Sequence, residues 1–276
     1  RGRNWRRVWD ADVVDAPSGF RGFPRPRVEG GAFYLPMHGG YDPRSNHGFH
    51  EGTAWQYQWL AQQDVAGLAA AMGGRAATLL RLDAFFAHDE LAKDIDGGAR
   101  KYWVVGPYSY YNQFRYNPNN EPDLHSPWMY TLLGQPWKTT TVVRAAQALF
   151  SDAPDGVTGN DDLGTMSAWY VFSALGLYPA VPGTGQLLLH APRFPRAQLD
   201  LGHGRMLTLE APGADAAGPH YVEAVRVDGR PHPGVAIDWS NLRDGGTLHF
   251  QLASQPDPRG WGTHPLDLPA SPCPAH

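Results

Sequence analysis

Cysteine is almost absent from the sequence. Cys273, close to the C-terminus, is the single cysteine among 276 residues. One thiol can form neither an internal disulfide nor a cysteine metal cluster, so the sequence excludes a disulfide-rich scaffold and a zinc site built on cysteines. The redox compartment stays open.

Charge is also sparse, and long hydrophobic runs are missing. Charged residues make up 18% of the chain, the net charge is −4, and basic residues gather only within residues 1–7 and 21–27. A continuous basic stripe usually binds nucleic-acid backbones, so we do not expect a nucleic-acid partner. No run of about 18 apolar residues occurs, so no membrane span is expected. The chain does not open with the basic and apolar pattern of a signal segment.

Aromatic residues are abundant instead. The chain has 10 Trp, 12 Tyr and 12 His, together with 32 Gly and 25 Pro. Trp and Tyr rings stack on the apolar faces of sugars, so this composition suits a carbohydrate cleft. Aromatic anchors of a core and its loops explain it equally well. A hydrophobic content of 42% allows one large domain or two smaller ones.

Helical spacing of apolar residues dominates the chain up to about residue 180. The strongest pattern begins after Glu51 and Gly52 and ends at the pair Gly73 and Gly74. Further helices are predicted at about residues 75–86, 128–133, 139–150 and 166–175. Residues 1–9 also have the spacing of an amphipathic helix, which leads us to expect that the natural chain starts upstream.

Short alternating segments replace helical spacing after residue 180. Strands are predicted near residues 187–189, 206–209, 221–227 and 247–252, with turn signals between them. We therefore predict a mainly α chain with a C-terminal antiparallel β unit. The helices would occupy residues 1–180, the β unit residues 181–262, and a Pro-rich extended tail residues 263–276.

Two carboxylates stand at junctions between a loop and a helix. Glu51 precedes an aromatic-rich helix, and a partly desolvated carboxyl there holds a proton more readily, as a general acid must. Asp162 lies in a glycine-bounded loop before another helix, beside Asn160 and Asp161. Helix capping explains either carboxylate alone. The second loop, however, has more polar groups than a cap requires, which favours a functional site.

A third polar segment, residues 116–125, contains two prolines and several amide and carboxylate oxygens. Closely spaced hard oxygen ligands suit Ca²⁺ better than Zn²⁺. A turn built on Asn and Asp side chains is the alternative.

Four motifs resemble glycoside hydrolase family 92. They are Glu-Gly-Thr-Ala-Trp-Gln-Tyr from Glu51, Asn-Asn-Glu-Pro-Asp from Asn119, Gly-Gln-Pro-Trp-Lys-Thr from Gly134, and Gly-Asn-Asp-Asp-Leu-Gly-Thr-Met-Ser-Ala-Trp-Tyr from Gly159. A weaker similarity follows in Val-Pro-Gly-Thr-Gly from Val181, and residues 221–261 resemble the end of the family's catalytic region. Together these segments cover nearly the whole chain.

The resemblance implies a calcium-dependent, exo-acting α-mannosidase that inverts the anomeric centre. The family combines an N-terminal β-sandwich with an (α/α)6 domain, so this chain would hold the later helices, as a partial (α/α)6 toroid, and the closing β segment. By motif position, Glu51 matches the general acid and Asp162 the general base. Inversion requires a water beside the base, which implies carboxyl groups about 6.5 to 9.5 Å apart.

The resemblance also implies a metal site and a substrate site. Asn119, Asn120 and Glu121 match the calcium site, and the ion would bind the mannose 2- and 3-hydroxyls. The side chains expected to contact substrate are Trp55, Gln56, Gln113, Arg115, Asn160 and Asp161. Thr53, Thr165 and Asn160 depart from residues common in the family, but both catalytic carboxylates are kept. Sugar contacts made by the family's earlier segments lie outside this sequence, and without them the chain alone can be inactive.

The sequence leaves two substrate classes open, a neutral mannoside and a mannosyl phosphate. The resemblance favours neutral glycans with α-linked mannose, α-1,2-linked ones first. Many α-1,2-specific relatives place a His-Glu pair before the calcium motif, however, and this sequence has no such pair. Arg115 suits a phosphate, as in mannose-1-phospho-6-mannose, unless it pairs with a nearby Asp. A phosphate leaving group needs little protonation, so a general acid at Glu51 favours a neutral glycan.

Two other classes of protein are alternatives to this interpretation. One is a non-catalytic carbohydrate-binding fragment. The other is a different (α/α) toroid enzyme, such as a lyase or a retaining hydrolase with carboxylates about 5 Å apart. A mannose-containing substrate leads us to expect an extracellular or periplasmic location.

Overall fold

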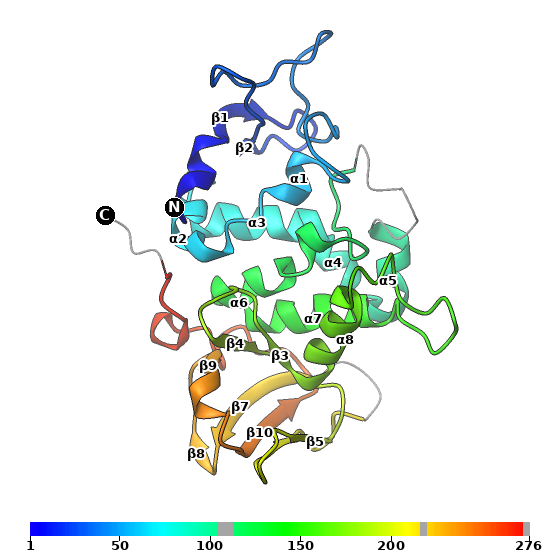
Figure 1. Cartoon of the computed structure of the whole chain (residues 1–276), viewed down its shortest axis with the longest axis vertical. Coiled ribbons are helices and arrows are strands. Elements are labelled where there is room, and N and C mark those ends of the chain that lie inside the picture. The colour runs from blue at the N-terminus through cyan, green and yellow to red at the C-terminus, as the bar shows by residue number, and fades with distance from the viewer. Residues whose placement is uncertain (104–112, 216–219, 273–276) are drawn as a thin grey trace.

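A computed structural model of the chain describes residues 1–103, 113–215 and 220–272 (Figure 1). Along the long axis of the molecule, a small N-terminal hairpin lies at one end, the helices in the middle and the sheets at the other end (Figure 1). No helix within these ranges has both the length and the apolar character needed to cross a membrane.

The N-terminal segment is not the helix that its apolar spacing predicts. A single 3-10 turn, Asn4–Arg7, leads into the antiparallel hairpin of β1 (Trp9–Val14) and β2 (Arg21–Pro24). Buried Arg81 anchors this hairpin because its guanidinium donates to the carbonyl oxygens of Arg21 and of Gly22, the latter at 2.8 Å. Long-range contacts of this kind override the local helical pattern.

The helical region has eight α-helices in the described ranges. They are α1 (Ala54–Tyr57), α2 (Val65–Ala71), α3 (Arg75–Phe86), α4 (His88–Leu91), α5 (Ile95–Tyr102), α6 (Met129–Leu132), α7 (Pro136–Gln147) and α8 (Thr165–Leu175). Short 3-10 turns lie at Gln62–Asp64, Glu121–Asp123, Ser126–Trp128, Trp239–Asn241 and Pro265–Asp267. The predicted helix at residues 75–86 is confirmed. Glycines with positive φ follow α6 and α8, at Gly134 and Gly176.

The long helix predicted after Gly52 is wrong. The chain forms two helices there, α1 and α2, separated by the turn at Gln62–Asp64. Asp64 starts the second helix, since its carboxylate accepts a hydrogen bond from Gly67 N at 3.2 Å. The apolar spacing is continuous because both pieces bury residues in one core.

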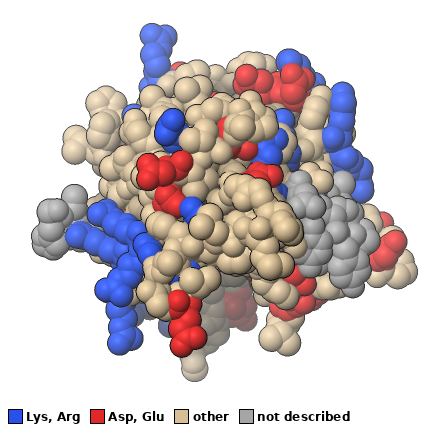
Figure 2. Space-filling view, turned by 90° about the horizontal axis from the view of Figure 1, so that it is seen from above, with Lys and Arg blue, Asp and Glu red and all other residues tan. Residues whose placement is uncertain are grey.

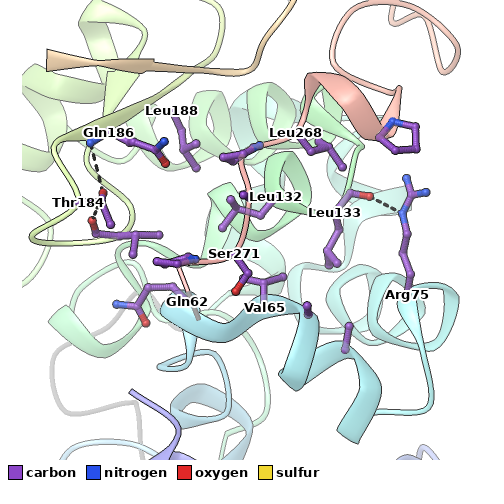
Figure 3. A pocket seen from close by; sticks show the side chains of 17 residues that line it. Gln62, Val65, Arg75, Leu132, Leu133, Thr184, Gln186, Leu188, Leu268 and Ser271 are labelled. Carbon is purple, nitrogen blue, oxygen red and sulfur yellow. Dashed lines mark hydrogen bonds between the residues drawn. The ribbon is translucent and has the colours of Figure 1, made fainter. Parts of the chain in front are cut away.

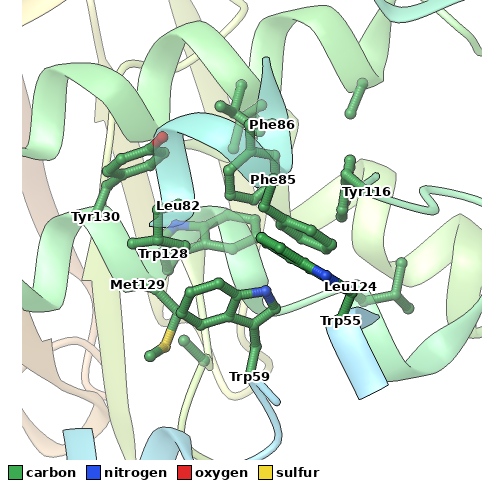
Figure 4. Close-up of a cluster of buried hydrophobic side chains, with 14 of the residues drawn as sticks. Trp55, Trp59, Leu82, Phe85, Phe86, Tyr116, Leu124, Trp128, Met129 and Tyr130 are labelled. Atoms are coloured by element: carbon green, nitrogen blue, oxygen red, sulfur yellow. The ribbon is translucent and has the colours of Figure 1, made fainter. Parts of the chain in front are cut away.

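Aromatic side chains fill the core between the helices (Figure 4). Trp55, Trp59, Phe85 and Phe86 are fully buried, and their rings pack edge-on or tilted against neighbouring aromatics. Most of the aromatic excess in this region is therefore core. Helix α7 packs against α4, α5 and α6 and holds this layer together.

The described part of the C-terminal region forms two sheets. Their strands are β3 (Leu177–Tyr178), β4 (Gln186–Leu189), β5 (Arg196–Asp200), β6 (Met206–Glu210), β7 (Tyr221–Val227), β8 (Arg230–Pro231), β9 (Ala236–Asp238) and β10 (Gly246–Ala253). The larger sheet has the order β5-β6-β10-β7-β8, and the smaller one β3-β4-β9. The prediction of a wholly antiparallel unit is wrong at one pair, because β10 runs parallel to β6. Strand β9 belongs to the smaller sheet, and the next strand, β10, lies between β6 and β7 in the larger sheet.

One aromatic contact joins the helices to the sheets. The ring of Trp128 stacks on that of Tyr178 in β3, with centroids 3.7 Å apart, and its Nε1 donates to His190 Nδ1 at 3.3 Å. A second core, built around Leu209, Leu248 and other strand residues, lies inside the β region.

Candidate active site

Glu51 lies in the loop before α1, which begins at Ala54 after Gly52 and the N-cap Thr53. Its backbone is left-handed, with φ of +50°, and its side chain is 38% exposed. The side-chain amide of Asn120 donates both to the Glu51 carbonyl oxygen at 3.1 Å and to Glu51 Oε2 at 3.3 Å. Exposed His50 places its Nε2 3.7 Å from the other oxygen, Oε1. The carboxyl group is thus held on one side and open on the other.

Asp162 lies in the loop that leads into α8. It too is left-handed, with φ of +43°, and it is exposed. Its neighbour Asp161 serves the helix, because Asp161 Oδ1 accepts bonds from Ser167 N and Ser167 Oγ, each at 2.8 Å. Thr165 fixes the loop by donating its Oγ1 to the Asp162 carbonyl at 2.7 Å. The capping role therefore falls to Asp161 rather than to Asp162.

The loop after Tyr116 is organised by a buried acid. Asp123 is 1% exposed, and its Oδ2 accepts a bond from Asn117 N at 3.1 Å. Asn117 in turn accepts a bond from Asn119 N through its Oδ1, at 3.0 Å. Burial raises the pKa of Asp123 well above its ordinary value, despite the bond from Asn117. These contacts hold Asn119 and Asn120 in fixed places.

Glu121 brings the three loops together. The side chain of Asn120 links it to Glu51, since it bonds to Glu51 Oε2 and to Glu121 N. Burial raises the pKa of Glu121, and the neighbouring carboxyl groups of Asp162 and Glu51 raise it further. The predicted acid, base and calcium residue thus come from three distant segments and meet at one place.

A glycine permits the close approach of two of these loops. A Cβ at Gly159, where φ is +71°, would lie only 2.3 Å from the carbonyl oxygen of Asn119. Thr158 Oγ1 also donates to Asn119 Oδ1. Glycine is therefore required at this position for the loop that carries Asp162 to lie on the loop that carries Glu121. Asn160 is exposed on the same loop.

The donors at this place are chemically suited to a hard cation. The neighbouring carboxyl groups of Glu121 and Asp162 offer oxygens that a divalent cation could bind. Within the described ranges, no three His, Cys, Asp or Glu side chains form a metal-ligand cluster. A Ca²⁺ ion takes about six to eight oxygens, so carbonyls, water or sugar hydroxyls would have to complete its shell.

Two predicted substrate contacts have structural roles in this fold. The Trp55 ring is fully buried against Phe20, Phe23 and Phe114, so it has no free face for a sugar. Gln56 is 1% exposed, and its side chain bonds to Thr53 N at 3.0 Å and the carbonyl of Arg115 at 3.1 Å. The expectation that these two side chains contact substrate is corrected accordingly. Their positions after Glu51 reflect core packing and a capping box.

Gln113 and Arg115 lie beside α1. The carbonyl of Gln113 accepts a bond from Thr53 Oγ1 at 2.7 Å. Arg115 donates its Nη1 to the carbonyl of Ala84 and forms no ion pair within the described ranges, so the alternative of an Asp partner is not seen there. Tyr111 and Asn112, which begin this segment, lie outside the described residues.

Arg44 is a neighbour of Arg115 that the sequence did not indicate. The two guanidinium groups lie over the ring of Phe114, at 3.9 and 4.5 Å from its centroid. Burial lowers the pKa of Arg115, and the charge of Arg44 lowers it further. Arg44 also binds Asp15 through two hydrogen bonds of 2.6 and 2.8 Å. No local motif signals this pairing, because it joins segments that are distant in sequence.

A cavity of about 340 Å³ lies away from these loops. It is lined by α2, the end of α6, β4 and the C-terminal segment, with Leu132, Leu188 and Leu268 among its walls (Figure 3). It includes none of the three site carboxylates. Seen from above, charged side chains of both signs surround a largely uncharged middle, without a continuous basic stripe on that face (Figure 2).

Comparisons with known proteins agree with these motifs. The model of the glycosyl hydrolase family 92 catalytic domain matches residues 1–254. The chain is 25% identical over 295 residues to a protein of Arthroderma benhamiae named an uncharacterized secreted glycosidase, covering 98% of this chain and 34% of that protein.

Solved structures are similar over the same length. A family GH92 α-mannosidase of Bacteroides thetaiotaomicron matches with a TM-score of 0.73 and 25% identity, covering 97% of this chain and 32% of that one. A family GH92 inverting mannosidase of the same organism matches with a TM-score of 0.70 and 28% identity, covering 98% of this chain and 35% of that one. The chain spans about a third of the length of these relatives.

Proposed function

The chain belongs to glycosyl hydrolase family 92, and from this premise we propose that it carries the acid and the base of an exo-acting, inverting α-mannosidase. The observation that carries the proposal is the meeting of Glu51, Glu121 and Asp162 in one cluster. Glycoside hydrolysis needs a pair of carboxyl groups at one place. Relatives named α-mannosidase and inverting mannosidase support the mannoside as substrate. Glycans with α-1,2-linked mannose are the first class to test.

The two carboxyl groups take unequal roles in this proposal. Glu51, bonded by Asn120 and only partly exposed, protonates the departing glycosidic oxygen. Asp162, exposed at the solvent side of its loop, accepts a proton from the water that attacks the anomeric carbon. The bond between Asp161 and Ser167 keeps the helix start satisfied, which leaves Asp162 available.

Calcium is the proposed cofactor, held by Glu121 with oxygens of Asn119 and Asn120. The proximity of the Glu121, Asp162 and Glu51 carboxyl groups supports this, because negative charge accumulates there. When bound, the ion would neutralise this charge and hold two sugar hydroxyls as a template. The rest of the ligand shell would come from water and substrate.

The fold and the location follow as further proposals. We infer that α1 to α8 form part of an (α/α)6 toroid, in which the cluster at Glu51 and Asp162 lines the sugar site. A curated relative is named a secreted glycosidase, which supports an extracellular or periplasmic location.

Isosteric amides test the proposal best. In the full-length protein, Glu51→Gln and Asp162→Asn should each lower mannose release from an α-1,2-mannobiose by about 100-fold or more. Asn tolerates the left-handed backbone that Asp162 adopts, so this change removes the charge and keeps the loop. The exposed carboxylates Glu90 and Asp152, changed to Gln and Asn, are matched controls outside the site.

The anomer of the first product separates the mechanisms. Proton NMR immediately after mixing should show β-mannose, as inversion of an α-linkage requires. Initial release of α-mannose would overturn inversion and favour a retaining enzyme. Full activity in both amide variants would overturn the catalytic assignment and favour a carbohydrate-binding fragment.

A mannosyl phosphate is the second candidate substrate, as in mannose-1-phospho-6-mannose. Its support is the pair of guanidinium groups at Arg44 and Arg115, of which Arg115 lacks an ion-pair partner within the described ranges. A guanidinium fork fits phosphate oxygens. Arg115→Ala should then reduce hydrolysis of the phosphodiester far more than that of mannobiose. An equal loss on both would remove the phosphate role.

A further inference from the structure

We propose that Asn120 is a positioning residue for the acid Glu51, an inference that rests on the proposed glycosidase function. Asn120 is 8% exposed, and both ends of its amide are engaged. Its Nδ2 donates to the carbonyl oxygen and Oε2 of Glu51, at 3.1 and 3.3 Å, while its Oδ1 accepts from Glu121 N at 3.2 Å. One side chain thereby connects the acid to the loop of the proposed calcium ligand.

The bonds from Asn120 stabilise Glu51, whose own backbone conformation is unfavourable. Glu51 is left-handed, a conformation that is strained for a non-glycine residue and persists only when its surroundings enforce it. The bond from Asn120 to the Glu51 carbonyl is one such constraint. Without it, the peptide could relax and move the carboxyl away from the reacting oxygen.

The second bond fixes the orientation of the carboxyl group. Nδ2 of Asn120 donates to Oε2, so the other oxygen, Oε1, lies on the side of exposed His50. Asn120 therefore holds the direction of the carboxyl group as well as its backbone.

The loop that carries Asn120 is itself held in place by hydrogen bonds and packing. Buried Asp123 binds Asn117, Asn117 binds Asn119, and Thr158 binds Asn119 from the facing loop. Gly159 packs against the Asn119 carbonyl. A side chain on so constrained a loop can place its partner without reorganisation, which is the property required of a positioning group.

Substitutions can separate this role from metal binding. Asn120→Asp keeps a side-chain oxygen for a cation but removes both N–H bonds to Glu51. Asn120→Ala removes the oxygen and the N–H bonds together. If positioning of the acid is the role, both variants lose the same catalytic step, whereas only the alanine variant loses a calcium oxygen.

Leaving-group dependence provides the readout. In the full-length protein, both variants should hydrolyse α-1,2-mannobiose about 100-fold more slowly, since misplacing a reacting group by about 1 Å costs this much. Hydrolysis of 2,4-dinitrophenyl α-mannoside, whose leaving group needs no acid, should change less than about 10-fold. Glu51→Gln should show the same pattern, and its rate losses on the two substrates are the reference for complete loss of the acid. Calcium affinity from titration calorimetry should be kept in Asn120→Asp.

Three outcomes would contradict these expectations. Equal losses on both substrates, with folded variants of unchanged melting temperature, would overturn acid positioning and leave a metal-binding role. Unchanged mannobiose hydrolysis in Asn120→Ala would overturn it as well. If the unsubstituted protein hydrolysed neither substrate, the proposed function would fail, and this inference with it.

Discussion

Glu51 and Asp162 share an uncommon backbone conformation. Both have positive φ, +50° and +43°, outside glycine. Such strain is concentrated at sites where surrounding structure over-determines the backbone. The sequence predicted these two carboxylates because each lies between a loop and an apolar helix. It could not predict their left-handed backbone, since no local rule forces Glu or Asp into that region.

Residue contacts also decided which predicted substrate residues have a structural role. Trp55 and Gln56 follow Glu51 in a motif that resembles family 92, yet both are buried. Sequence proximity to a catalytic carboxylate does not fix the direction of a side chain. In a helix that begins at Ala54, neighbours point to different faces.

Buried His190 makes the stability of the protein depend on pH. Its Nε2 lies 2.9 Å from the carbonyl of Ser173 and its Nδ1 accepts from Trp128, so the neutral ring with a proton on Nε2 fits. Burial lowers its pKa from 6.5 to about 3, despite the bond to Ser173. The unfolded state therefore binds a proton first as the pH falls. The contribution of His190 to stability is complete above about pH 6.5 and is lost progressively towards pH 3.

Urea unfolding at a series of pH values measures this effect. Between pH 6 and pH 4, His190 should contribute up to about 1.4 kcal/mol of lost unfolding free energy per pH unit. His190→Gln should have a shallower dependence, although buried His125, with a pKa lowered by burial to about 4, keeps part of it. Exposed His47→Gln is the matched control. Identical slopes in all three proteins would refute this coupling.

At the scale of elements, the division between α1 and α2 shows the limit of periodicity. Apolar spacing continues through both helices because both pack into one core. The division depends on Asp64, whose carboxylate receives Trp5 Nε1 at 3.1 Å and lies 3.2 Å from the Arg6 guanidinium. Partners from the N-terminus cannot be inferred from a local pattern. Helices such as α3, which end at local signals, were predictable.

Two similar caps allow these contacts to be measured. Asp64 and Asp94 each accept a bond from the backbone N–H of a glycine three residues later, at 3.2 and 3.0 Å. Asp64 is buried and has the added partners, whereas Asp94 is exposed. Asp64→Ala should cost about 2 to 3 kcal/mol, because it removes a cap and leaves the Trp5 N–H without its acceptor. Asp94→Ala should cost about 1 kcal/mol.

The ion pair with Arg6 adds little to this difference, since the Arg6 side chain is 50% exposed and solvent screens the charge. Arg6→Ala, measured with the two aspartate variants by urea unfolding, should therefore have a small effect. Equal losses for Asp64→Ala and Asp94→Ala would show that capping alone accounts for both.

At the scale of the whole molecule, the order of helices followed by strands was predictable, and the topology was not. Turn residues and alternation mark individual strands. Strand β10 pairs in parallel with β6, and β9, which comes before β10 in the chain, belongs to the other sheet. The N-terminal hairpin depends on buried Arg81, which binds it from α3. Both features are long-range contacts that residue spacing does not encode.

Calcium binding should stabilise the whole molecule, because the proposed ion lies where three distant chain segments meet. Glu51, Glu121 and Asp162 repel one another when all are ionised, and a divalent cation would replace this repulsion with shared attraction. Binding to the folded state alone adds about 2.7 kcal/mol to the free energy of unfolding at a free concentration one hundred times the dissociation constant.

The melting temperature of the full-length protein should therefore fall when a chelator removes calcium, and recover when calcium is restored. Mg²⁺ should restore less, since its octahedral shell is smaller and more rigid. Glu121→Gln should remove the calcium response while the control Glu90→Gln keeps it; a response that survives Glu121→Gln would place the ion elsewhere.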